Sequence, residues 1–148
     1  MITEDYVSFE TAKLLKEKGF DERCFAFYYI MPHKTAITYN TDFPTNSDLE
    51  LIYKYKEFGS LPTLQMAMKW LREVHKCYIT FTWEFKEYDN NYKPIYKDIT
   101  WSFNIAIPKY NSARKGDGSY FDLDSDKEYD SYEQACEVAL KYCLENLI

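Results

Sequence analysis

The stretches Cys77-Tyr-Ile-Thr-Phe-Thr-Trp-Glu-Phe-Lys86 and Ile99-Thr-Trp-Ser-Phe-Asn-Ile-Ala-Ile107 decide the fold. In both, large apolar side chains alternate with residues that are mostly polar. A half-buried β-strand has this period of two, because successive side chains point to opposite faces of the sheet. The two stretches therefore predict a long antiparallel hairpin with one apolar face. On that face we expect four large aromatic side chains to point into the core: Phe81, Trp83, Trp101 and Phe103.

Helical patterns lie on both sides of this hairpin. Residues 8–18 predict a short helix that Ser8 caps and Gly19 ends. Residues 62–75 carry apolar side chains at positions i, i+3, i+4 and i+7, which indicates an amphipathic helix. Residues 131–146 begin with a capping box and continue with periodic apolar residues. Three helices are therefore expected.

Further strands complete the predicted order. Residues 23–31 are apolar on both faces, which favours a central strand, and residues 35–41 follow as its antiparallel partner. Weaker patterns predict a third strand at Leu49–Glu57 and a short one at Tyr120–Leu123. The expected order is α-β-β-(β)-α-β-β-(β)-α, with the weaker strands in parentheses. We predict one α+β domain over residues 1–148, in which helices cover one face of an antiparallel sheet.

Composition narrows the class of protein. The chain has 148 residues, 19% of them aromatic, including 15 Tyr, which excludes a disordered chain and is enough for one buried core. It has no run of 18 apolar residues and no signal-peptide pattern at its N-terminus, so a cytoplasmic protein without membrane attachment is expected. The four cysteines show no Cys-x-x-Cys spacing, and we expect reduced thiols in the core.

The charge disfavours direct nucleic-acid binding. The net charge is −6, and the 18 Lys and Arg residues are scattered along the chain. Residues 62–147 share the α-β-β-β-α order of a double-stranded-RNA-binding domain. In such domains the last helix begins with lysines that hold phosphate, whereas here Tyr132, Glu133, Gln134 and Glu137 stand at that point. The likeness to these domains therefore extends to the arrangement of helices and strands in layers, and not to RNA binding.

No catalytic arrangement is present in the sequence. The only histidines are His33 and His75, and neither has a spacing that suggests a triad, a Cys–His pair or a metal site. Gly116 and Gly118 precede a predicted strand rather than a helix, which is the wrong setting for a phosphate loop. We therefore expect no bound cofactor, and an enzyme ranks third among the functions considered.

An acidic segment resembles a calcium loop in spacing alone. Counted from Asp122, acidic residues occupy positions 1, 3, 5, 7, 9 and 12, the last being Glu133. Position 6 is Lys127 in place of the glycine that the loop requires, and a strand precedes the segment where a helix should. We predict a solvated acidic loop without a tight calcium or other metal site.

Tyrosines gather at the expected hairpin turn, Asp89-Asn90-Asn91. Tyr88, Tyr92 and Tyr96 surround it. Tyrosine offers a large contact area at low entropic cost, so these three are the predicted binding residues. The alternative is that they pack at the boundary of the core. A second candidate surface is the pair Tyr53 and Tyr55.

Three segments carry a resemblance to a known group of proteins. They are residues 2–10 with 12–21, residues 62–75, and residues 132–137 with 139–148. They are similar to small uncharacterised proteins of phage and mobile elements in gut Bacteroidota. The resemblance implies the cytoplasm of a bacterial host cell and no catalysis. The function expected is that of a non-enzymatic accessory protein acting by protein–protein contact or self-association. The alternative is a small-ligand or metal-binding protein with a pocket between sheet and helices.

Overall fold

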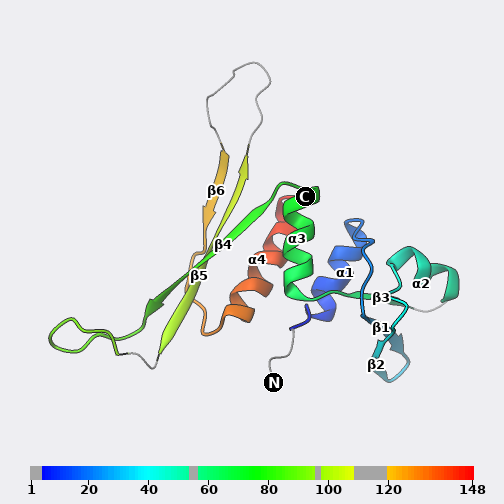
Figure 1. The fold of residues 1–148 in the computed structure, drawn as a ribbon, viewed down its shortest axis with the longest axis horizontal. Helices are drawn as coiled ribbons and strands as arrows, with labels where there is room; N and C mark the ends of the chain where they lie inside the picture. Colours follow the sequence, from blue (N-terminus) through cyan, green and yellow to red (C-terminus); the bar gives the residue numbers. More distant parts are fainter. Residues whose placement is uncertain (1–4, 54–56, 96–97, 109–119) are drawn as a thin grey trace, which may run out of the picture. The chain divides into compact units, whose positions relative to one another are not determined.

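The computed structural model describes residues 5–53, 57–95, 98–108 and 120–148 (Figure 1). The α+β class is confirmed, and the described strands form two three-stranded antiparallel sheets, β2-β1-β3 and β4-β5-β6, where one sheet was expected. The elements in order are α1 (Phe9–Glu17), β1 (Ala26–Met31), β2 (Lys34–Tyr39), α2 (Asn46–Ile52), β3 (Phe58–Leu61), α3 (Leu64–Val74), β4 (Tyr78–Phe85), β5 (Ile99–Pro108), β6 (Tyr120–Asp124) and α4 (Tyr132–Asn146).

The chain divides into two compact units. The first comprises Met1–Trp70 and Leu140–Ile148, and the second comprises Leu71–Ala139. Helices α3 and α4 each contribute residues to both units. The organisation as one domain stays a prediction. None of the helices in the described part of the chain is long and apolar enough to cross a bilayer.

In the first unit, β1 is the central strand, as its apolar faces predicted. It pairs antiparallel with β2 and with β3, so that Tyr28 lies between Ile37 and Gly59. The Tyr28 side chain is almost completely buried, and a Cβ added to Gly59 would lie 2.8 Å from its ring. Glycine is therefore required at this point of β3, because the Tyr28 ring occupies the space of a side chain. Helices α1 and α2 pack against β3.

The predicted strand at Leu49–Glu57 is wrong in its described part, because residues 46–52 form helix α2. Thr45 and Asp48 form a reciprocal capping box. The Asp48 amide donates to Thr45 Oγ1 at 3.1 Å, and the Thr45 amide donates to Asp48 Oδ2 at 3.0 Å. This cap supplies partners to amides that would otherwise be unpaired at a helix start. The third strand of the sheet is instead β3, four buried residues that include Gly59 and Ser60.

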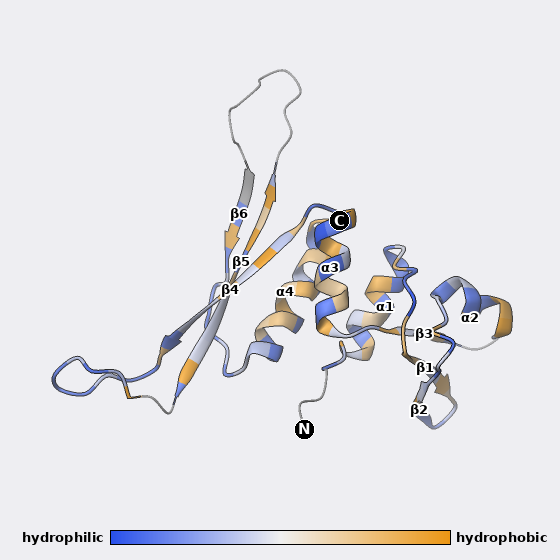
Figure 2. Ribbon diagram, in the orientation of Figure 1, coloured by the Kyte–Doolittle hydropathy of each residue, from blue (hydrophilic) through white to orange (hydrophobic). Residues whose placement is uncertain are grey.

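In the second unit, the register of the hairpin agrees with the predicted apolar face. Phe81 pairs with Phe103 and Trp83 pairs with Trp101. Strongly hydrophobic residues recur at intervals along both strands (Figure 2). The start of α4 covers part of this face, with the Tyr132 ring 4.9 Å from Phe81 and 5.2 Å from Trp101.

The predicted burial of the four aromatic residues holds only near α4. Phe103 is 5% exposed and stacks on Tyr129 at 5.8 Å, and Phe81 and Trp101 are half-buried. Trp83 lies on the predicted face, directly opposite Trp101, but it is 52% exposed, so its expected burial was wrong. Its ring contacts Phe85 on the same strand.

The four cysteines are reduced and buried, as expected: Cys24, Cys77, Cys136 and Cys143. Burial raises the pKa of the Cys24 thiol to about 12, against a hydrogen bond with Ser60 that lowers it. Burial likewise raises the pKa of Cys136 to about 11. These thiols stay protonated at neutral pH, which suits packing and not nucleophilic chemistry.

Candidate functional site

The tip of the β4–β5 hairpin is a turn organised by Asp89. Its Oδ1 atom accepts the amides of Asn91 and Lys93 at 2.8 and 2.9 Å. Its backbone amide donates to the Lys93 carbonyl at 2.8 Å, and its carbonyl accepts the Tyr92 amide at 3.0 Å. Tyr92 takes a φ of 58°, the left-handed conformation that lets the chain reverse. The turn therefore lies where the sequence predicted it, and the side chain of Asp89 fixes its shape.

The predicted binding tyrosines differ in what they contact. Tyr88 is 56% exposed and Tyr92 is 89% exposed, whereas Tyr96 lies outside the described residues. The Tyr88 ring lies 6.4 Å from Phe85, whose ring lies 5.3 Å from Trp83. Trp83, Phe85 and Tyr88 thus form a row of rings along the hairpin, which we call the aromatic strip. Sequence alternation predicted that Trp83 and Phe85 share a face, and their continuity with Tyr88 emerges only from the structure.

The second tyrosine surface has a structural role in its described part. Tyr53 is half-buried, and its ring lies 6.1 Å from Phe27 and 5.8 Å from Phe58. It therefore packs on the small core around Leu49 in the first unit. Tyr55 lies outside the described residues.

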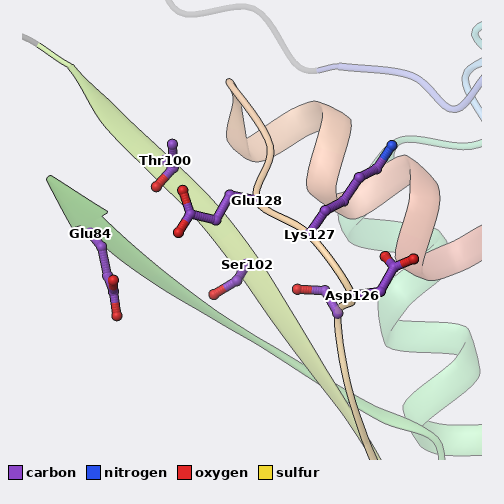
Figure 3. A pocket seen from close by; sticks show the side chains of 7 residues that line it. Glu84, Thr100, Ser102, Asp126, Lys127 and Glu128 are labelled. Carbon is purple, nitrogen blue, oxygen red and sulfur yellow. The ribbon is translucent and has the colours of Figure 1, made fainter. Parts of the chain in front are cut away.

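A pocket of about 330 Å³ lies on the polar face of the second sheet (Figure 3). Its wall comes from a local break in strand pairing. The Ser125 amide donates to the Phe103 carbonyl, and the next rungs join Trp101 to Tyr129. Between these rungs β5 advances by two residues and its partner by four, so Asp126–Glu128 bulge out of the ladder. The pocket is lined by Glu84, Thr100, Ser102, Ser125, Asp126, Lys127 and Glu128.

The acidic segment does not fold as a calcium loop. Asp122 and Asp124 lie on β6, where both carboxylates accept hydrogen bonds from the Asn104 side-chain amide, that of Asp124 at 3.1 Å. Asp126 belongs to the bulge. Among the residues that the structure describes, no three Asp, Glu, His or Cys side chains form a group that could hold a metal ion.

A second pocket, of about 260 Å³, lies in the first unit and is mainly apolar. Phe25 is central to it, with ring centroids 5.3 Å from Tyr39 and 5.7 Å from Phe43. The Arg23 guanidinium lies at its edge and donates to the Asp42 carbonyl at 3.4 Å. This pocket could not be predicted, because Phe25 belongs to the segment 23–31, whose sequence is apolar on both faces. Its lining consists of Tyr6, Arg23, Phe25, Phe43, Leu61, Thr63 and Met66.

Comparison of the chain with protein-family models, with curated proteins and with solved structures gave no match.

Proposed function

We propose that this chain is a non-enzymatic accessory protein of a phage or mobile element, which acts in the bacterial cytoplasm by contact with another protein. The aromatic strip of the hairpin and Tyr92 of the adjoining turn are the proposed contact surface. The observation that carries the proposal is the exposure of Trp83 and Tyr88, at 52% and 56%, on either side of the half-buried Phe85, where a monomer in water would bury or disperse large rings.

The chemistry of the strip suits a protein interface. Tryptophan and tyrosine carry much of the binding energy in protein interfaces, because a rigid ring loses little entropy on contact. The carboxylate of Asp89 accepts two hydrogen bonds that order the turn beside the strip. Because the turn is already ordered, it loses little conformational entropy on binding. The partner is a host or phage protein, or a second copy of the chain.

The test is an alanine series read by binding and by folding. We expect Tyr88→Ala and Tyr92→Ala each to weaken the complex by about 2 kcal/mol, while the free energy of unfolding changes by less than about 1 kcal/mol. The partner is first isolated on the tagged chain from host lysate and identified by mass spectrometry, and sedimentation measures self-association. Tyr39→Ala is the matched control, because Tyr39 is also 56% exposed but belongs to the first unit. Variants that unfold earlier yet hold the partner normally would assign these tyrosines to packing.

The second candidate function is the binding of a small ligand. It is favoured by the apolar pocket of the first unit, whose aromatic walls and single arginine suit a flat apolar molecule with an anionic group. Native mass spectrometry of the chain purified from host cells tests it. A retained mass that Phe43→Ala removes would support it, and an empty protein would count against it.

A further inference from the structure

Strand β4 forms an edge of the second sheet, and one side of its backbone has no strand beside it. The sheet order is β4-β5-β6, and none of the isolated bridges between described residues involves β4. An edge strand presents a row of amides and carbonyls that can pair with a further strand. The pairing with β5 decides which residues present these groups.

The hydrogen bonds of the hairpin identify the residues of β4 that face outward. The Lys86 amide donates to the Asp98 carbonyl at 2.9 Å, and the register of the hairpin, continued by one step, places these two residues opposite each other. Bonded pairs alternate along an antiparallel ladder, so the even-numbered residues of β4 bond to β5. The backbone groups of three odd-numbered residues therefore point away from β5, and no described strand pairs with them: Ile79, Phe81 and Trp83.

The far side of β5 has the complementary pattern. The Phe103 carbonyl accepts the Ser125 amide, and Trp101 exchanges backbone hydrogen bonds with Tyr129. Odd-numbered residues of β5 thus bond away from β4, which leaves its even-numbered residues to bond to β4. The two sides of β5 agree on which groups of β4 face outward.

The edge of β4 carries few of the charges that keep sheet edges apart. Strand β2, an edge of the first sheet, begins with Lys34, and β6, the other edge of the second sheet, carries Asp122 and Asp124 among five residues. Such charges oppose the addition of another strand. Strand β4 has eight residues, no proline and a single charge, that of Glu84. It is therefore suited to accept a partner strand.

A second copy of β4 is complementary to this edge on its apolar face. Two copies can run antiparallel about a two-fold axis centred on Phe81, so that Phe81 faces Phe81 and Ile79 faces Trp83. Each outward-facing residue then meets another one. Strand β4 already accepts a partner of this composition from β5, where Phe81 lies opposite Phe103 and Trp83 opposite Trp101.

The polar face has no like-charge pair in this arrangement. Thr80 of one copy faces Thr82 of the other, and Glu84 faces the uncharged Tyr78. The side chains of Thr80, Thr82 and Glu84 are all exposed, so they are accessible to a second chain. Both faces of β4 thus match a second β4.

We propose that two copies of this chain associate through their β4 edges, which joins two three-stranded sheets into one sheet of six strands. The inference rests on the proposed function, contact with another protein, and names a second copy as that partner. The two-fold pairing uses both β4 edges, so assembly stops at the dimer. The contact is small, and we expect a Kd of about 1–100 µM.

The first test is sedimentation equilibrium of the full chain up to about 500 µM. Replacing both threonines, by Thr80→Lys with Thr82→Lys, places two ammonium groups opposite each other on either side of the axis and should raise the Kd at least about tenfold. The matched variant, Thr80→Lys with Thr82→Glu, places an ammonium opposite a carboxylate and should keep the Kd within about threefold. Thermal unfolding checks that both variants fold.

The net charge of the chain makes this comparison sharp. The double lysine variant is less negative than the parent chain at −6, so general charge repulsion alone would make it associate more strongly. Pairing at the β4 edge predicts the opposite order. The sign of the difference therefore separates the two causes.

The second test is amide hydrogen exchange of the parent chain, measured above and below the Kd. The Phe81 and Trp83 amides should be protected only in the dimer, whereas the Thr82 amide, which bonds to β5, should be protected in both states. Tyr92→Ala should leave the Kd of the dimer unchanged within about twofold, because Tyr92 lies in the turn outside β4.

Four results would overturn the proposal. They are a chain that stays monomeric at about 500 µM, assembly beyond the dimer, equal weakening by the two double variants, and a dimer whose Phe81 and Trp83 amides exchange as in the monomer. A monomeric chain that loses a captured host protein through Tyr92→Ala would overturn this inference alone and leave the proposed function standing. Protection of the Phe81 amide by that host protein would assign the edge to a strand of a different protein.

Discussion

Asn46 connects two backbone segments inside the first unit. It is 6% exposed, its Nδ2 donates to the Phe20 carbonyl at 2.6 Å, and its Oδ1 accepts the Ser60 amide at 2.8 Å. One side chain thus supplies partners to two backbone groups, at the exit from α1 and in β3. A buried polar residue of this kind has no signature in the sequence, because its partners lie 26 and 14 residues away.

We predict that Asn46→Leu lowers the free energy of unfolding by about 2–4 kcal/mol, because a buried carbonyl and a buried amide both lose their partner. Urea denaturation followed by circular dichroism measures it. Asn90→Leu, at an exposed position of the hairpin turn, is the control and should change stability by less than about 0.5 kcal/mol. A loss under about 1 kcal/mol for Asn46→Leu would mean that water replaces the amide.

At the scale of elements, the periodic patterns in the sequence were sufficient to predict a helix or strand where one face of that element is buried. The three amphipathic helices and the β4–β5 hairpin have such faces, and the structure has all of them. Helix α2 does not: Leu49 is buried while Leu51 and Ile52 are exposed, so its apolar residues fit a strand as well as a helix. The Thr45–Asp48 capping box was the local signal that could have decided for the helix.

The candidate sites also differ in whether the sequence alone could predict them. The exposure of Tyr88 and Tyr92 could be predicted. Turn-forming residues indicate where the hairpin tip lies, and side chains at a tip have few neighbours to pack against. The polar pocket could not be predicted, because it depends on which rungs of the ladder form on either side of Asp126–Glu128. The alternation of a strand predicts the face of the sheet on which each residue lies. It does not predict that four residues of one strand will lie opposite two residues of its partner.

Phe103 and Trp83, which lie on neighbouring pairs of the hairpin's apolar face, should differ in what they contribute to stability. Phe103→Ala should cost about 3–5 kcal/mol, because it removes a buried ring that stacks on Tyr129. Trp83→Ala removes a larger but half-exposed ring and should cost about 1 kcal/mol or less. Equal losses in the free energy of unfolding, measured by urea titration of both variants, would show that Trp83 is covered in solution. Trp101→Ala removes the half-buried ring directly opposite Trp83, and its cost should fall between the two values.

At the scale of the whole molecule, the two units carry separate carboxylates that respond to acid. Burial raises the pKa of Asp21, but the hydroxyl and amide of Ser47, each donating to it at 2.7 Å, lower it further, and the net pKa lies below its usual 3.8. In the second unit, the hydrogen bond from Lys86 lowers the pKa of Asp130. A carboxyl with a lowered pKa in the folded state stabilises the fold above its unfolded pKa, and this stabilisation is lost as pH falls through the folded value.

We therefore predict that Asp21→Asn lowers the free energy of unfolding at pH 7 by roughly 1 kcal/mol or less, since the side chain is exposed and solvent screens it. The difference from the parent chain should vanish when the pH lies well below the usual 3.8. Urea titrations of both proteins at neutral and strongly acidic pH measure it. A difference that persists unchanged in acid would assign the effect to shape rather than to charge.

The division of α3 and α4 between the units has a consequence for synthesis on the ribosome. The first unit needs both Met1–Trp70 and Leu140–Ile148, and all of Leu71–Ala139 is made between them. At about 5–20 residues per second, translation of the intervening segment takes roughly 3–14 s. During that time Met1–Trp70 lacks Leu140–Ile148, so its apolar surfaces are exposed and accessible to chaperones while the second unit leaves the ribosome. A slow codon or a stall between Trp70 and Leu140 prolongs this exposure, so the order of translation, and not only the native contacts, governs the yield of folded protein.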